Sequence, residues 1–138
     1  MMLRGWTVIV VLMGILAGCS NSSVQRVAGQ SFPSRAGDFP IDVYIGNDTP
    51  AELQQQVPDA RPPAKLPQNS VAIGWVNMNG AQLSSWSSLV DAARGKARDL
   101  GGNGLVVKAV SQPLVGYDGF GMPHNGKYLS MAVVRYLE

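Results

Sequence analysis

The residue types that most often carry chemistry are scarce in this chain of 138 residues. It has one cysteine, Cys19, and one histidine, His124, which follows Asp118 by six positions. A single cysteine excludes a disulfide framework and any cysteine-cluster metal site. One histidine with one aspartate is too few for a zinc or copper site, and no nucleophile-elbow motif suggests serine catalysis. We therefore expect no enzyme, metal or cofactor. The alternative is a periplasmic domain that binds a small ligand or a metal through His124.

The most unusual stretch of the sequence is a glycine-rich segment, 116–127 (GYDGFGMPHNGK). Its glycines do not lie between a strand and a helix, and no Gly-Lys-Ser/Thr follows, so a phosphate-binding loop is excluded. Aromatic side chains contribute strongly to protein interfaces. We therefore interpret the loop as a possible partner-binding element, with Tyr117, Phe120, Met122 and His124 as candidate contacts. The alternative is a plain connection between two strands.

The start of the sequence is typical of an exported protein. Arg4 is the only charged residue before Arg26, and it precedes an apolar run from Trp6 to Ala17. In a helix these residues span roughly 18 Å, which is too short for a hydrocarbon core about 30 Å thick. A positive start, a short apolar run and small residues after it predict a signal peptide over residues 1–18.

The run ends in Leu16-Ala17-Gly18-Cys19. These four residues resemble the lipobox of bacterial lipoproteins and match it at every position. The resemblance implies cleavage before Cys19, a diacylglyceryl group on its thiol, and often an acyl chain on the new amine. Because a bilayer holds two or three acyl chains almost irreversibly, the mature protein is expected on the membrane without spanning it.

The same resemblance suggests the compartment. In enterobacterial lipoproteins, a residue other than aspartate after the cysteine favours the outer membrane, and here that residue is Ser20. We therefore expect an outer-membrane anchor facing the periplasm, with the inner membrane less favoured. Residues 19–40 are rich in serine, glycine and proline and predict a flexible tether.

The remaining residues, 41–138, predict a single small α+β domain. Strand patterns cover 41–45, 71–78, 105–110 and 129–137, and a helical pattern covers 84–100. Four prolines between 58 and 67 predict an extended connector. The expected fold is a mixed sheet of about four strands in the order β-β-α-β-β, with one helix packed on one face. The other face would be open unless the tether, the connector or a partner covers it.

Charge adds little to this interpretation. The formal net charge of +2 excludes a strongly basic nucleic-acid binder. Arg94, Lys96 and Arg98 follow one another on the predicted helix, where a solvated face with local ion pairs is expected. Lys108 interrupts an apolar strand and is expected to extend its ammonium into water.

The end of the helix and the next strand read Leu100-Gly101-Gly102-Asn103-Gly104-Leu105, and a later strand ends in Met131–Val134. This pattern resembles the small α/β domains of the YbjQ-type putative heavy-metal-binding family. It also resembles the outer-membrane lipoproteins that sense envelope stress in the Rcs phosphorelay. Both have alanine where Gly102 and Gly104 stand here. The resemblance spans about 71–136 and implies the fold and an anchor-tether-domain plan.

These observations favour a non-enzymatic envelope lipoprotein that acts as a protein-interaction, sensor or assembly module. The expected partners are the membrane, through the acyl chains, and an envelope protein. The 112–127 loop and the open sheet face are the candidate docking surfaces.

Overall fold

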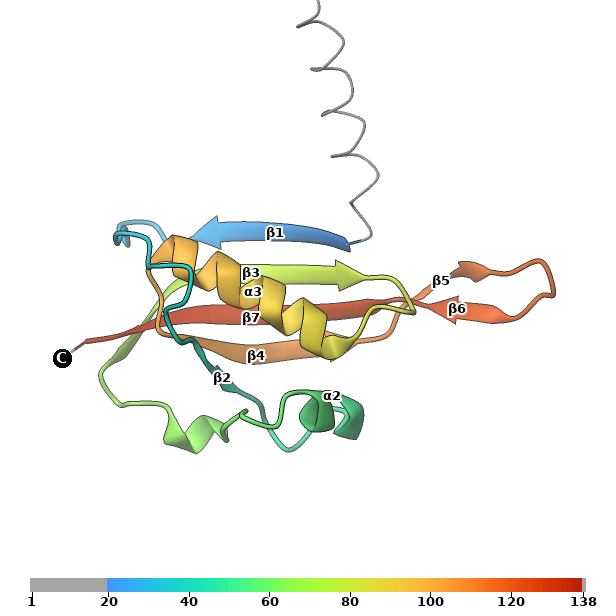
Figure 1. Ribbon diagram of the computed structural model, residues 1–138, viewed down its shortest axis with the longest axis horizontal. Helices are drawn as coiled ribbons and strands as arrows, with labels where there is room; N and C mark the ends of the chain where they lie inside the picture. The colour runs from blue at the N-terminus through green and yellow to red at the C-terminus, as the bar shows by residue number, and fades with distance from the viewer. Residues whose placement is uncertain (1–19, 138) are drawn as a thin grey trace, which may run out of the picture.

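The computed structural model describes residues 20–137. The predicted signal peptide and Cys19 lie outside these residues. Figure 1 shows a five-stranded sheet with a long helix across one face and a two-stranded hairpin beyond one end. The sheet order is β1 (Ser20–Arg26), β3 (Ser70–Gly80), β7 (Lys127–Tyr136), β4 (Gly104–Ser111) and β2 (Asp42–Tyr44).

The α+β class predicted from the sequence is confirmed, but the four-strand, one-helix order is not. The four expected strands are β2, β3, β4 and β7. The structure adds β1 to the sheet and pairs β5 (Leu114–Tyr117) with β6 (Pro123–Asn125) in a separate small sheet. Helix α2 (Ala51–Gln56) matches the one or two helical turns that residues 51–57 favour, and a 3-10 turn, η1 (Pro63–Lys65), lies within the proline-rich connector.

Helix α3 (Trp86–Leu100) supplies one side of the main core. Its hydroxyl cap is Ser85, which accepts a hydrogen bond from the Ser88 amide, and Gly101 ends it in the left-handed conformation that glycine tolerates. The periodicity predicted its buried face, which consists of Trp86, Leu89, Val90, Ala93, Ala97 and Leu100. Two alanines on that face bring the helix close to the sheet.

Strand β7 lies between β3 and β4 and runs antiparallel to both. Strands β3 and β4, which α3 connects, are therefore parallel to each other, and β7 lies between them. Alternate residues of these strands face the helix, and Ile73, Leu105 and Met131 are buried there. The central position of β7 explains its almost continuous run of buried residues from Leu129 to Val134.

The prediction of a flexible tether over residues 20–40 is wrong, because the segment pairs with and packs on the domain. Residues 20–26 form β1, which pairs with β3 along its whole length. Residues 27–40 then fold over the end of α3, where Phe32 and Phe39 pack against the core. Arg35 donates to the carbonyl of Gly102 at 3.3 Å and lies over the Phe39 ring. These contacts bind the segment to the domain, because a paired backbone and half-buried aromatic rings oppose a mobile coil.

The sheet face away from α3 is partly covered. Tyr44, Val106, Ala132 and Val134 are buried there, with Leu66 from the connector packed on them. Farther along this face the side chains are polar. Asn77 accepts a hydrogen bond from the Ser130 hydroxyl at 2.7 Å and donates to Ser23 of β1 at 3.3 Å. The uncovered part of the face therefore combines this hydrogen-bonded polar cluster with the ring of Trp75, which is 37% exposed and lies opposite Ala132 of β7.

Candidate functional site

The glycine-rich segment singled out in the sequence forms the β5–β6 hairpin, and Figure 1 shows it extending beyond the end of the five-stranded sheet. Its base is closed by hydrogen bonds from the Gly126 amide to the Pro113 carbonyl (2.8 Å) and from the Asn125 side chain to the Gln112 carbonyl (3.1 Å). The segment is therefore an ordered hairpin whose base is held in place next to the start of β7.

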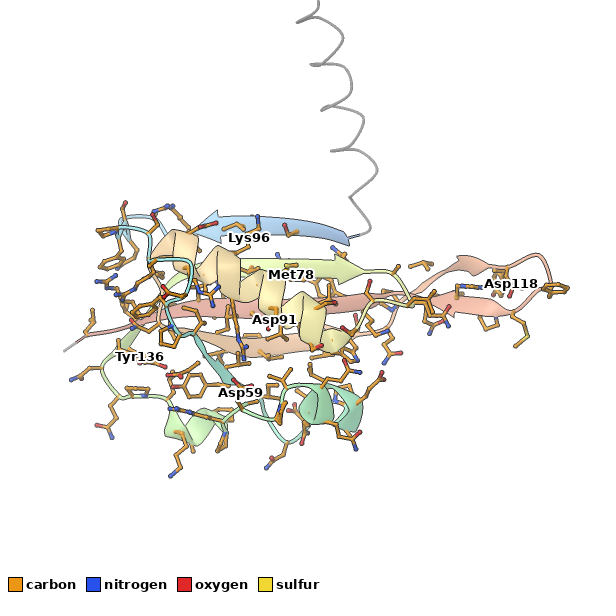
Figure 2. All side chains as sticks on the ribbon, viewed as in Figure 1. Asp59, Met78, Asp91, Lys96, Asp118 and Tyr136 are labelled. Atoms are coloured by element: carbon orange, nitrogen blue, oxygen red, sulfur yellow. The ribbon has the colours of Figure 1, made fainter. Side chains whose placement is uncertain are left out.

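Asp118 organises the hairpin tip, where Figure 2 labels it. One carboxylate oxygen accepts the amides of Phe120 (2.8 Å) and Met122 (3.0 Å), and the Asp118 amide donates to the Met122 carbonyl. These two backbone hydrogen bonds, first that from Met122, lower the pKa of the Asp118 carboxyl. The ionised form of Asp118 therefore stabilises the turn that presents Phe120.

The apolar side chains of the hairpin are directed into solvent. Phe120 is 94% exposed, and in the adjoining β3–α3 loop Leu83 is 98% exposed. The other exposed apolar residues of the hairpin are Leu114, Val115, Tyr117 and Met122. We call this set with Leu83 the apolar end. Several large apolar side chains exposed on one short hairpin and the loop beside it are the kind of surface that binding sites present.

The β3–α3 loop and the hairpin enclose a hollow of about 610 Å³, lined by Ala81, Gln82, Leu83, Asp118, Met122, Pro123 and His124. Lys127 joins the two segments, because its ammonium donates to the Gln82 carbonyl at 2.6 Å. The hollow lies at the same end of the sheet as the exposed Phe120 and Leu83.

His124 is held within the hairpin. Its Nε2 atom lies 3.3 Å from the second carboxylate oxygen of Asp118, and 45% of the side chain is exposed. Among residues 20–137, no three His, Cys, Asp or Glu side chains gather as a metal site would require. The structure thus brings together Tyr117, Phe120, Met122 and His124 on one hairpin, as the sequence suggested. It gives His124 one acidic neighbour, Asp118.

The basic residues noted in the sequence lie elsewhere. Arg94 bonds Asp59 at 2.9 Å and Asp91 at 3.2 Å, so it forms the local ion pairs expected of a helix surface. Figure 2 shows Asp59 and Asp91 on neighbouring elements. Arg98 donates to the Phe39 carbonyl at 2.7 Å. Lys108 is exposed at a bulge in β4.

A hydroxyl network at the opposite end of the sheet was missed in the sequence. The Tyr136 hydroxyl donates to Asp42 at 2.8 Å and lies 2.5 Å from the Tyr44 hydroxyl. Burial, with the bonds to Tyr44 and Asp42, raises the pKa of Tyr136 well above its usual value. No sequence signal joins Tyr44 and Tyr136, which are far apart in the chain, and the network stabilises the β2 edge.

No known family model matches the sequence, and no curated protein matches it either. Among solved structures, the chain is similar to the Francisella virulence factor FvfA. The likeness has a TM-score of 0.49 and 11% sequence identity, over 83% of this chain and 97% of that one. A likeness of this size assigns no function. No helix within residues 20–137 is long and apolar enough to cross a bilayer.

Proposed function

We propose that this protein is a non-enzymatic lipoprotein of the bacterial envelope, anchored by acyl chains on Cys19, whose folded part is a docking module. The apolar end is its binding element. The observation that carries the docking proposal is the ordered hairpin that holds Phe120 and its apolar neighbours in solvent. A fold without a binding role would be expected to bury these side chains or replace them with polar ones.

The anchor is supported by the sequence before the domain. A short apolar run after a single positive charge ends in Leu-Ala-Gly-Cys, at the distance from the start that lipoprotein export requires. Acyl chains bind a bilayer with about 0.8 kcal/mol per buried methylene, so two or three chains suffice for permanent attachment. Ser20 favours an outer-membrane position facing the periplasm.

The choice of the hairpin over the open sheet face has a physical basis. The uncovered part of that face holds Asn77, which is hydrogen-bonded to Ser130 and Ser23, and one large apolar side chain, Trp75, which is 37% exposed. Docking there would bury one partly exposed ring together with polar groups that are already hydrogen-bonded. Docking at the apolar end removes exposed hydrocarbon from water, which is favourable in proportion to its area.

A non-enzymatic role agrees with the arrangement of His124 and Asp118. The carboxylate that would orient a catalytic histidine already accepts two backbone amides of its own turn. The pair therefore closes the hairpin, and a reacting group would need further acids, bases or donors beside it.

Photo-crosslinking in growing cells tests the proposal. A photoreactive amino acid is placed at Tyr117, at Phe120 and, as a control, at the exposed Lys65 on the connector. We expect capture of an envelope component, lipid or protein, at the two hairpin positions and not at Lys65. In the Cys19→Ala protein that capture should be lost. Equal capture, or none, at all three positions would contradict the docking role.

A further inference from the structure

We infer that the apolar end docks on the lipid bilayer that holds the acyl chains, so that the β5–β6 hairpin is a second membrane contact of the domain. This inference rests on the proposed anchor at Cys19 and names the partner of the proposed docking element. The envelope protein expected from the sequence becomes the alternative outcome of its test.

Strand β1 begins at Ser20, the residue directly after Cys19, and its backbone is paired with β3 from that first residue onward. Consecutive Cα atoms are only about 3.8 Å apart. An acylated Cys19 would therefore hold the start of β1 close to the bilayer, with no tether to let the domain stand away from it.

The hairpin and the β3–α3 loop lie at the end of the sheet where β1 starts. Ser20 is paired with Gly80, and Gly80 is paired with Lys127, so these residues form one row across three strands. The β3–α3 loop leaves the sheet immediately after Gly80, and the hairpin joins it immediately before Lys127. Figure 1 shows β1 starting at the same end of the sheet from which the hairpin extends. The attachment point therefore lies beside the base of the hairpin and the β3–α3 loop, and the hairpin tip extends beyond them.

The apolar end carries side chains that suit a membrane–water interface. Phe120, Met122 and Leu83 are hydrocarbon-rich and exposed, and Tyr117 has the apolar ring and polar hydroxyl that favour a membrane–water interface. Between Leu114 and Asn125 the only acid is Asp118, and its carboxylate oxygens are engaged by the Phe120 and Met122 amides and His124. Placing this tip among lipid headgroups would therefore leave no carboxylate there without a hydrogen-bond partner.

The anchor also makes a modest lipid affinity sufficient. Once one end of the domain is attached, contact between the hairpin and the same bilayer is an intramolecular event with a high effective concentration. The hairpin needs no pocket or specific ligand for this contact. The result is a domain held at two points, with the covered and polar faces of its sheet oriented by the membrane.

Site-specific fluorescence quenching tests this inference on the full acylated protein. Because Cys19 is blocked by its lipid, one introduced cysteine can be labelled selectively with an environment-sensitive dye. The test site is Gly119→Cys, since an added Cβ at Gly119 meets no atom within 4 Å. The control is Lys65→Cys. The proteins are placed in vesicles of phosphatidylethanolamine and phosphatidylglycerol that contain a doxyl-labelled lipid quencher.

We expect several-fold stronger quenching and a blue-shifted emission for the dye at Gly119 compared with Lys65. Adding Phe120→Ser to Gly119→Cys should reduce that quenching at least severalfold while the anchor stays intact. Equal, weak quenching at both sites in an acylated protein would overturn the bilayer contact and leave the proposed lipoprotein standing, with a protein partner favoured. A protein with a free Cys19 thiol would instead overturn the proposed anchor, and this inference with it.

Discussion

At the scale of single residues, Asp118 is the side chain on which the candidate site depends. It is the one acid of the hairpin, and it ties together the turn that exposes Phe120. Gly121 adopts a positive φ of 77°, which other residues disfavour, and this conformation permits the tight turn. The exposed aromatic ring is therefore presented by a local network and needs no contact with the core.

Replacing Asp118 should change the hairpin without changing the domain. Asp118→Ala removes the acceptor of two amides, so we expect the amide NMR signals of Phe120 and Met122 to shift toward random-coil positions. Asp118→Asn keeps an acceptor oxygen but loses the charge, so its signals should shift less than those of Asp118→Ala. The thermal midpoint of both variants should match that of the parent protein. A native tip in Asp118→Ala would show that the carboxylate does not organise the turn.

The same carboxyl gives the hairpin a pH dependence. Its hydrogen bonds from Met122 and Phe120 lower the pKa of Asp118, so the folded turn favours the ionised form. The stabilisation is complete above the unfolded pKa, about 3.9, and is lost as the pH falls through the lower folded value. Amide spectra recorded from pH 7 downward should show the tip loosening only below pH 4, and loosening near neutral pH would contradict this assignment.

Tyr136 gives a prediction of opposite sign at the other end of the sheet. Tyr136→Phe removes hydrogen bonds to Asp42 and the buried Tyr44 hydroxyl, so the free energy of unfolding should fall by about 1–3 kcal/mol. Because burial raises the pKa of Tyr136, its stabilisation is complete below the unfolded value of 10.0 and declines as the pH rises above it.

Denaturant titrations at pH 7 and above pH 10 measure both effects. Tyr117→Phe, which changes an exposed tyrosine of the hairpin, is the matched control and should leave stability unchanged. If Tyr136→Phe were as stable as this control at pH 7, the hydroxyl network would have no structural role.

At the scale of elements, two glycines near α3 illustrate opposite constraints. Gly95 lies within the helix with open space where a Cβ would be, whereas a Cβ on Gly102 would lie 2.5 Å from Val133 Cγ1. Glycine thus weakens the helix at 95 without a packing reason, and at 102 it permits close contact between the helix end and β7.

These glycines predict opposite effects of one substitution. Gly95→Ala should raise the free energy of unfolding by about 0.5–1 kcal/mol, because alanine is the better helix former. Gly102→Ala should lower it by about 1–3 kcal/mol, because the core must shift to admit a methyl group. Denaturant unfolding of both variants measures this, and equal effects would contradict the packing described at Gly102.

The elements also show how far sequence patterns reach. Helix α3 was predictable because Trp86, Leu89 and Val90 repeat at its period, and its end was predictable from Gly101. Strand β1 was not, since Val24 is the only apolar residue among SNSSVQR, and the strand is held by backbone pairing that any side chain allows. The apolar hairpin was visible as aromatic residues among glycines. The Asp118 turn and the proximity of Leu83 depend on three-dimensional geometry.

At the scale of the whole molecule, correcting the tether changes the proposed mode of action. A tether over residues 20–40 would let the domain reach partners far from the membrane. With β1 starting at Ser20, an acylated Cys19 would instead keep the domain at the bilayer surface. With an acylated Cys19, the anchor, tether and domain plan that the resemblance implied would give way to a domain held directly at the membrane.

The intact mass of the protein extracted from cell membranes tests the central proposal most directly. We expect a chain that starts at Cys19 and carries a diacylglyceryl group, with or without a further acyl chain, and a Cys19→Ala protein that carries none. A chain recovered with residues 1–18 still present and its cysteine unmodified would contradict it.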